Sequence, residues 1–110
     1  MDQSKFYYLY NAKVIADDGT FLGVISQDKD DTNSICNPYG NYGSKISLNS
    51  IFNPVGEYGN KFSHLSPFNE LSDTPPKIIK DNLVLGYLTL NKFIKNRVDT
   101  NELINWLLNK

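Results

Sequence analysis

The chain has 110 residues, of which 40% are hydrophobic, and its formal net charge is −1. This length predicts one domain with its own core, since about 100 to 200 residues is the usual span of a domain. A near-neutral chain lacks the basic face of a dedicated nucleic-acid binder. One Cys and one His exclude a disulfide framework and a Cys/His zinc site within a single chain, and we expect no cofactor.

The chain begins with a short aromatic run, residues 6–10, followed by Asn11. This run is shorter than the roughly 7–15 apolar residues of a secretory signal, and we expect it to form a strand. No stretch reaches the roughly 20 apolar residues that a membrane span needs. The single thiol favours a reducing compartment. These features predict a cytoplasmic protein, or a secreted one if a leader has been removed.

Two β-branched segments predict hairpins. Residues 13–17 lead through Asp18-Gly19 to residues 21–26, and residues 77–81 lead through Asn82 to residues 84–89. Gly23 and Gly86 hold the same place in the second strand of each hairpin. A glycine there indicates a bulge or the close approach of another backbone.

A sixteen-residue repeat lies between the hairpins. Residues 33–47 (NSICNPYGNYGSKIS) and 49–63 (NSIFNPVGEYGNKFS) are identical at ten of fifteen positions, and a third copy begins at Leu65 and decays after Asn69. The Asn-Pro steps start turns, and the paired glycines of each unit (Gly40 with Gly43, Gly56 with Gly59) can take positive φ where the chain reverses. Asn and Ser side chains can bond nearby backbone groups, so that an irregular coil satisfies itself. The apolar anchors of the two units are predicted to be Ile35, Tyr42, Ile46, Ile51, Tyr58 and Phe62.

The chain ends in a predicted amphipathic helix over residues 99–110. Asp99 serves as the N-cap, Glu102 completes a capping box, and Val98 with Leu103 forms a hydrophobic staple. Trp106 lies on the apolar stripe, so we expect it at the surface on which the helix docks.

Together these elements predict an α+β, mostly β domain. A small twisted antiparallel sheet of two hairpins carries the C-terminal amphipathic helix on one face, and the repeats form a turn-rich insertion. Within a single domain of residues 1–110, we expect the N-terminal strands and hairpin over 1–32, the repeats over 33–74, the second hairpin over 75–98 and the helix over 99–110. A small β-barrel is the alternative.

The order of these motifs resembles that of a bacterial family of uncharacterised function. In that family, tandem Asn-Pro-Tyr-Gly-x-Tyr-Gly-Ser units lie between Leu-Gly-x-x-Ser/Thr segments, and a Pro-Pro step precedes the second segment. The matching stretch here runs from Gly19 to Phe93. This sequence departs from the family pattern at Val55, where an aromatic residue is usual, and at Asn60, where Ser is usual. The resemblance implies hairpins flanking repeats and implies no activity.

Cys36 and His64 are the obvious candidates for a catalytic nucleophile and base. A thiol catalyst needs a neighbouring base and an electropositive, partly exposed setting. In the repeat alignment, however, Cys36 takes the place of two phenylalanines and His64 takes the place of Leu48. Packing and surface roles are therefore favoured, and no catalytic residue is predicted. A carboxylate such as Asp31 or Glu57 is the other catalytic candidate.

Two charged clusters also need an interpretation. Residues 28–33 contain three Asp and one Asn, but a calcium loop also needs a tight glycine turn and a late Glu, so we expect a solvated loop without a metal. Lys92, Lys95 and Arg97 form a small basic cluster around Phe93. Its size favours a solvated connector over a nucleic-acid contact.

The Tyr- and Asn-rich surface of the repeats is the best candidate for a function. Tyr offers an apolar face and a polar tip, which suit protein contacts and sugar stacking, although core packing competes for the same side chains. We predict a non-catalytic binding or protein-interaction module with a protein or glycan partner. A small enzyme and a structural subunit of a larger assembly are the alternatives. The candidate ligand-binding residues are Tyr39, Tyr42, Tyr58, Asn37 and Asn53.

Overall fold

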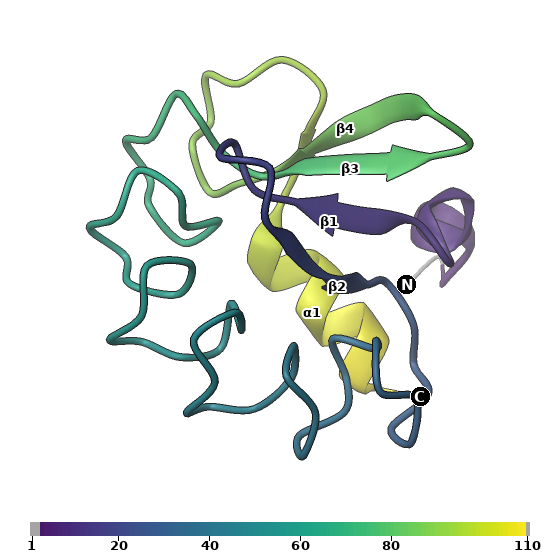
Figure 1. The fold of residues 1–110 in the computed structure, drawn as a ribbon. Helices are drawn as coiled ribbons and strands as arrows, with labels where there is room; N and C mark the ends of the chain where they lie inside the picture. The colour runs from purple at the N-terminus through teal and green to yellow at the C-terminus, as the bar shows by residue number, and fades with distance from the viewer. Residues whose placement is uncertain (1–2, 110) are drawn as a thin grey trace.

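The computed structural model describes residues 3–109 and consists of an open five-stranded sheet, a short N-terminal helix and a C-terminal helix (Figure 1). The predicted α+β fold is confirmed, and the sheet does not close into a barrel. In chain order, the elements are the 3-10 helix η1 (Gln3–Leu9), β1 (Lys13–Ile15), β2 (Phe21–Val24), β3 (Lys77–Lys80), β4 (Leu83–Leu88), β5 (Arg97–Val98) and the α-helix α1 (Thr100–Leu108).

Both predicted hairpins form, and they join into one sheet with the strand order β2-β1-β3-β4-β5. The pairing of β1 with β3, which connects the hairpins, is antiparallel. The fifth strand was not predicted. β5 runs parallel to β4, so the sheet is mixed rather than purely antiparallel.

Gly23 and Gly86 explain how other segments come close to the sheet. Gly23 has φ +113°, and a Cβ built on it would lie 2.7 Å from Cγ2 of Ile35 in the first repeat. A Cβ on Gly86 would lie 2.8 Å from the carbonyl oxygen of Asn96, just before β5. The register also shifts at both hairpins. The predicted bulge and close backbone approach are thus confirmed.

The N-terminal segment is a 3-10 helix, so the predicted strand is wrong. Phe6 and Leu9 are three residues apart and both buried, which fits the three-residue turn of this helix. The rings of Phe6, Tyr7 and Tyr10 surround Trp106 at centroid distances of 5.7, 5.5 and 6.3 Å. The aromatic side chains of residues 6–10 are explained by packing around the indole of Trp106 and not by pairing in a sheet.

Helix α1 begins at the predicted N-cap, but within residues 3–109 no bond from the Asp99 N–H to the Glu102 side chain completes the predicted capping box. Oδ1 of Asp99 accepts the backbone N–H of Glu102 at 3.0 Å, and Val98 and Leu103 are both buried. The side chain of Glu102 bonds to Nζ of Lys5 at 2.8 Å, so it ties the helix to η1.

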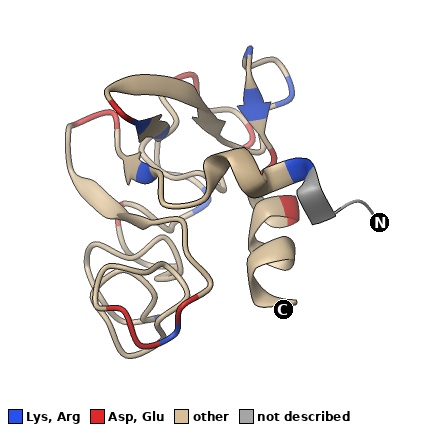
Figure 2. Cartoon of the chain, turned by 90° about the vertical axis from the view of Figure 1, so that its right-hand side faces the viewer, with Lys and Arg blue, Asp and Glu red and all other residues tan. Residues whose placement is uncertain are grey.

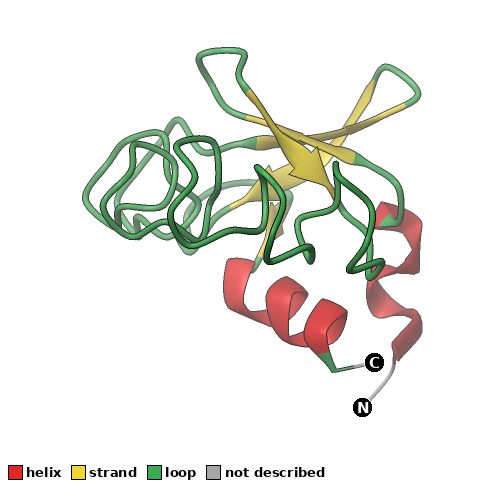
Figure 3. Cartoon of the chain, turned by 60° about the horizontal axis from the view of Figure 1, so that its bottom comes forward, coloured by secondary structure: helices red, strands yellow, loops and turns green. Residues whose placement is uncertain are grey.

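The repeats form an arc of loops that leaves β2 and returns to β3, beside the sheet and α1 (Figures 1 and 3). Basic and acidic residues are both spread over the chain in Figure 2, and their numbers nearly balance. Over residues 3–109, no helix is both long enough and apolar enough to cross a membrane.

Candidate functional site

A ladder of small polar residues, three or four positions apart, runs through the whole arc. In all but one of its steps, the backbone N–H of one member donates to the carbonyl oxygen of the member before it. Four steps of three residues and one step of four make up the sixteen-residue period. We call this set the turn ladder. Its members are Asp31, Ser34, Asn37, Gly40, Ser44, Ser47, Ser50, Asn53, Gly56, Asn60, Ser63, Ser66, Asn69 and Ser72.

Side chains reinforce the turn ladder at every member that has one. In all twelve, the side-chain oxygen accepts the backbone N–H of the residue two positions on, at 2.8–3.4 Å. These are Asx turns and their Ser equivalents, in which a short polar side chain imitates a backbone turn. The repeat is therefore an ordered array with few strand contacts. The three-residue step was visible in the sequence and was missed beneath the sixteen-residue period.

The ladder asparagines that lie three positions after Ser34, Ser50 and Ser66 use both the oxygen and the nitrogen of their side-chain amides. Nδ2 of Asn37 donates to the carbonyl oxygen of Asp31, and Nδ2 of Asn53 donates to that of Ser47, each at 3.1 Å. Their Oδ1 atoms accept the N–H groups of the turn. Asn37 and Asn53 are only 7% and 5% exposed, so their amides hold the backbone together.

The apolar side chains of the array divide between an inner and an outer side. Ile35 and Ile51 are buried in the core, as predicted. Ile46 and Phe62, which were predicted to be anchors, are 87% and 78% exposed, so that prediction is wrong. Each lies two positions after a ladder residue, Ser44 or Asn60, whose side-chain oxygen accepts its backbone N–H.

The paired glycines also differ from expectation. Neither Gly43 nor Gly59 has a positive φ, nor do Gly40 and Gly56. A Cβ at Gly43 or Gly59 would instead collide with the backbone of the asparagine six positions earlier. These two positions need glycine because the chain passes over itself without room for a side chain.

Three large side chains in equivalent positions are almost fully exposed. Tyr39, Val55 and Leu71 are 95%, 86% and 85% exposed, and each lies two residues after a capping ladder asparagine. We call these three residues the outer row. Phe93 has the same relation to Asn91 and is 96% exposed.

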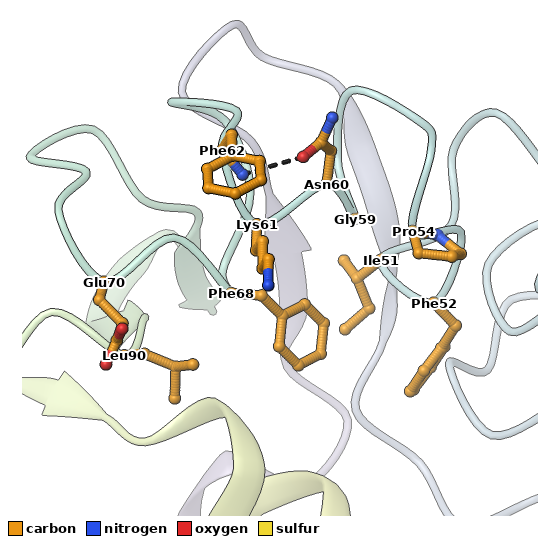
Figure 4. Close-up of a pocket in the computed structure, with 10 residues that line it drawn as sticks. All are labelled: Ile51, Phe52, Pro54, Gly59, Asn60, Lys61, Phe62, Phe68, Glu70 and Leu90. Carbon is orange, nitrogen blue, oxygen red and sulfur yellow. Dashed lines mark hydrogen bonds between the residues drawn. The ribbon is translucent and has the colours of Figure 1, made fainter.

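A groove of about 640 Å³ lies between the second and third units (Figure 4). Phe52, Phe68 and Leu90 contribute apolar surface, and Lys61 and Glu70 contribute opposite charges. In Figure 4, the side chain of Lys61 extends toward Phe68, while Glu70 lies beside Leu90. The sequence had not indicated this groove, because it depends on how two consecutive units and Leu90 are placed in space.

A second depression of about 470 Å³ adjoins the groove and shares Asn60 and Phe62 with it. Glu57 and His64 both line this depression. Phe62 therefore forms a ridge between two hollows.

Tyr42 and Tyr58 are half-buried and point inward. The ring of Tyr42 packs edge-on against Phe21 at a centroid distance of 4.8 Å. The hydroxyl of Tyr58 bonds to Oδ2 of Asp18 at 2.8 Å and to Oγ1 of Thr20 at 2.9 Å, which ties the array to the β1–β2 hairpin. The backbone N–H of Thr20 and then the Tyr58 hydroxyl lower the pKa of Asp18. The Thr20 hydroxyl favours a lower pKa for Tyr58, but burial and Asp18 outweigh it and raise that pKa.

We expect Tyr58→Phe to lower the free energy of unfolding by about 1 kcal/mol, because two hydroxyl bonds are lost at the surface. Tyr42→Phe is the matched control, since no hydrogen bond of the Tyr42 hydroxyl is found within residues 3–109. The raised pKa of Tyr58 stabilises the fold below the ordinary tyrosine pKa, and this contribution disappears as the pH rises through the folded-state value. Urea denaturation at pH 7 and above pH 10 measures both effects. Equal losses in the two variants would contradict the role of the Tyr58 hydroxyl.

The structure places the other candidate residues apart or in turns. Cys36 is buried, and burial raises the pKa of its thiol, although Lys29 partly offsets this. His64 is exposed in a different unit. Oδ1 of Asp31 caps the first ladder turn. Of the predicted basic cluster, Arg97 forms an ion pair with Asp99 at 2.9 Å. Within residues 3–109, no cluster of three or more His, Cys, Asp or Glu side chains could hold a metal ion.

Compared with protein-family models, curated proteins and solved structures, the chain matches none. The resemblance to the bacterial repeat family stays a prediction. The turn ladder nevertheless accounts for both departures from the family pattern. At position 60, Asn and Ser can both supply the capping oxygen, and at position 55 the side chain is exposed.

Proposed function

We propose that the protein is a non-catalytic protein-interaction module whose outer row contacts the partner. The observation that carries this proposal is the exposure of three large apolar side chains, Tyr39, Val55 and Leu71, on turns held by side-chain and backbone hydrogen bonds. Exposed apolar side chains that recur along one surface are suited to interaction with a partner, and these three occupy the same position in successive units. Because the turns are already ordered, binding loses little backbone entropy.

Of the two predicted partner classes, a protein is favoured over a glycan. Sugar recognition relies on free amides and hydroxyls beside flat aromatic faces, yet the amides of Asn37 and Asn53 are occupied by the backbone. Two of the three side chains in the outer row are aliphatic, and only Tyr39 offers an exposed ring. Apolar side chains of mixed shape suit the buried centre of a protein interface.

The buried thiol supports a non-catalytic role over the enzyme alternative. A nucleophilic cysteine is accessible and has a lowered pKa, whereas burial raises the pKa of Cys36. Glu57 and His64 line one depression, but no hydrogen bond joins them within residues 3–109.

Photo-crosslinking tests the proposal. A photoreactive residue at position 71, in cells that produce the protein, is expected to give a discrete adduct with a partner protein. Replacing Tyr39 and Val55 with Ser is expected to reduce the adduct about tenfold, as for removal of two central interface contacts. Exposed substitutions leave stability within about 0.5 kcal/mol, so thermal unfolding is expected to be unchanged.

Two controls accompany this experiment. The same photoreactive residue at Leu83, which is 64% exposed on β4, is expected not to give that adduct. The combined variant Cys36→Ser and His64→Leu is expected to retain it. An adduct that survives loss of Tyr39 and Val55 would refute the outer row as the contact. Loss of the cellular effect in the Cys36/His64 variant, with the fold intact, would favour the enzyme alternative.

A further inference from the structure

Phe62 is a projecting aromatic side chain beside an apolar hollow. Its ring is 78% exposed and lines the edge of the 640 Å³ groove. On the far side of the groove are Phe52 and Phe68, which are half-buried and pack against the core, together with Leu90. The same surface thus carries both an apolar projection and an apolar recess that can hold an aromatic ring.

The groove also carries one charge of each sign. Lys61 and Glu70 are exposed, and in residues 3–109 neither forms an ion pair. Nζ of Lys61 lies 5.4 Å from the centre of the Phe62 ring, and the side chain extends toward Phe68 within the groove (Figure 4). Glu70 lies beside Leu90 in the lining of the recess (Figure 4). The groove therefore carries a positive and a negative charge at separate places in its lining.

We propose that this groove binds a second copy of the chain in a two-fold dimer. Each copy inserts Phe62 into the groove of the other, and Lys61 of each copy faces Glu70 of the other. A two-fold interface uses the same patch on both copies, so the patch must be complementary to itself. This patch carries both an apolar projection and an apolar recess, and both a positive and a negative charge, so it is complementary to itself. A different protein would need to match only the projection or the recess, and only one of the two charges.

The dimer goes beyond the proposed function and does not use the outer row as its main contact. Tyr39 and Leu71 do not line the groove, so the dimer leaves them free for a partner. A small interface of this kind is typical of reversible, concentration-dependent association. The two proposals can therefore fail separately.

Sedimentation equilibrium of the full chain tests the dimer. From about 5 μM to about 500 μM, the range of transient association, the mean mass is expected to rise from 12.5 kDa toward twice that value. Phe62→Ser, Lys61→Glu and Glu70→Lys are each expected to weaken the dimer at least tenfold. Leu83→Ser and Tyr39→Ser serve as controls and are expected to leave the mass unchanged. All these side chains are exposed, so each variant is expected to keep its fold, which circular dichroism checks.

Charge exchange between copies gives the decisive result. The Lys61→Glu and Glu70→Lys variants are each expected to be monomeric alone and to form a heterodimer when mixed, because one charge pair then has its original form and the other is restored in reversed form. The double variant is expected to dimerise within about threefold of the original chain, as restored charge pairs do.

Three results would overturn the dimer: a monomer at every concentration, a dimer unaffected by Phe62→Ser, or no heterodimer on mixing the two charge variants. None of them bears on crosslinking from position 71, which tests the outer row alone.

Discussion

Replacing Gly59 with Ala is expected to destabilise the protein by about 3 kcal/mol or more, or to prevent folding, because rigid backbone occupies the space of the new methyl group. The added Cβ would collide with the carbonyl oxygen of Asn53 and lie 2.7 Å from that of Ile51. The Asn53 carbonyl accepts the N–H of Gly56 in the turn ladder, so it cannot move away without breaking that turn. Urea denaturation measures the effect.

Gly56→Ala in the same unit is the matched control. Its Cβ would meet the side-chain amide of Asn53 at 3.1 Å, which can shift by a few tenths of an ångström. Neither glycine has a positive φ, so the two variants share the gain of about 0.4–1 kcal/mol from a stiffer unfolded chain. If Gly59→Ala proves as stable as Gly56→Ala, the chain does not pass so closely over the backbone of Asn53.

Asn53→Asp is expected to lower stability by about 2–4 kcal/mol at pH 7, although only one atom changes. A carboxylate can still accept the N–H of Val55, but it cannot donate to the partly buried carbonyl of Ser47 and repels it instead. The protonated acid can donate, so the pKa of the new side chain is raised in the folded state. Folding then takes up a proton, and the stability of this variant is expected to rise as the pH falls from 7 toward 4.

Asn60→Asp provides the comparison. Only the oxygen of the Asn60 amide takes part in the ladder, where it accepts the N–H of Phe62. This acceptor survives the substitution, so we expect a change below about 1 kcal/mol and no gain on acidification. Equal losses at positions 53 and 60 would show that the donor half of the buried amide has no special role. Denaturation curves at several pH values distinguish these outcomes.

The sequence predicted those elements that a few neighbouring residues determine, namely turns, helix caps and bulges. The Asp18-Gly19 turn, the Asp99 cap and the Gly23 bulge each require a particular residue at a particular place, and all three are present. The N-terminal 3-10 helix was missed because Phe6 and its neighbours are aromatic in order to pack around Trp106, which is distant in sequence. β5 has only two residues and forms where Gly86 leaves room for it, so no periodicity could reveal it.

The candidate site was predictable in part. The repeat alignment singled out Tyr39, which is exposed, but could not separate it from Tyr42 and Tyr58, which are half-buried. All three tyrosines lie two positions after a ladder member, so their separation depends on packing against the sheet, where Tyr42 meets Phe21 and Tyr58 bonds to Asp18. The groove beside Phe62 is formed by neighbouring units, so only the three-dimensional arrangement reveals it.

The turn ladder also bears on how the chain reaches its fold. Pairing β1 with β3 closes a loop of about sixty residues, at an entropic cost of about 4 kcal/mol for a flexible chain. Ladder bonds span only two to eight residues, so each closes at little entropic cost before the ends of the sheet meet. A chain already curved by these bonds carries β3 back toward β1. We therefore expect the segment with the least regular secondary structure to guide the assembly of the sheet.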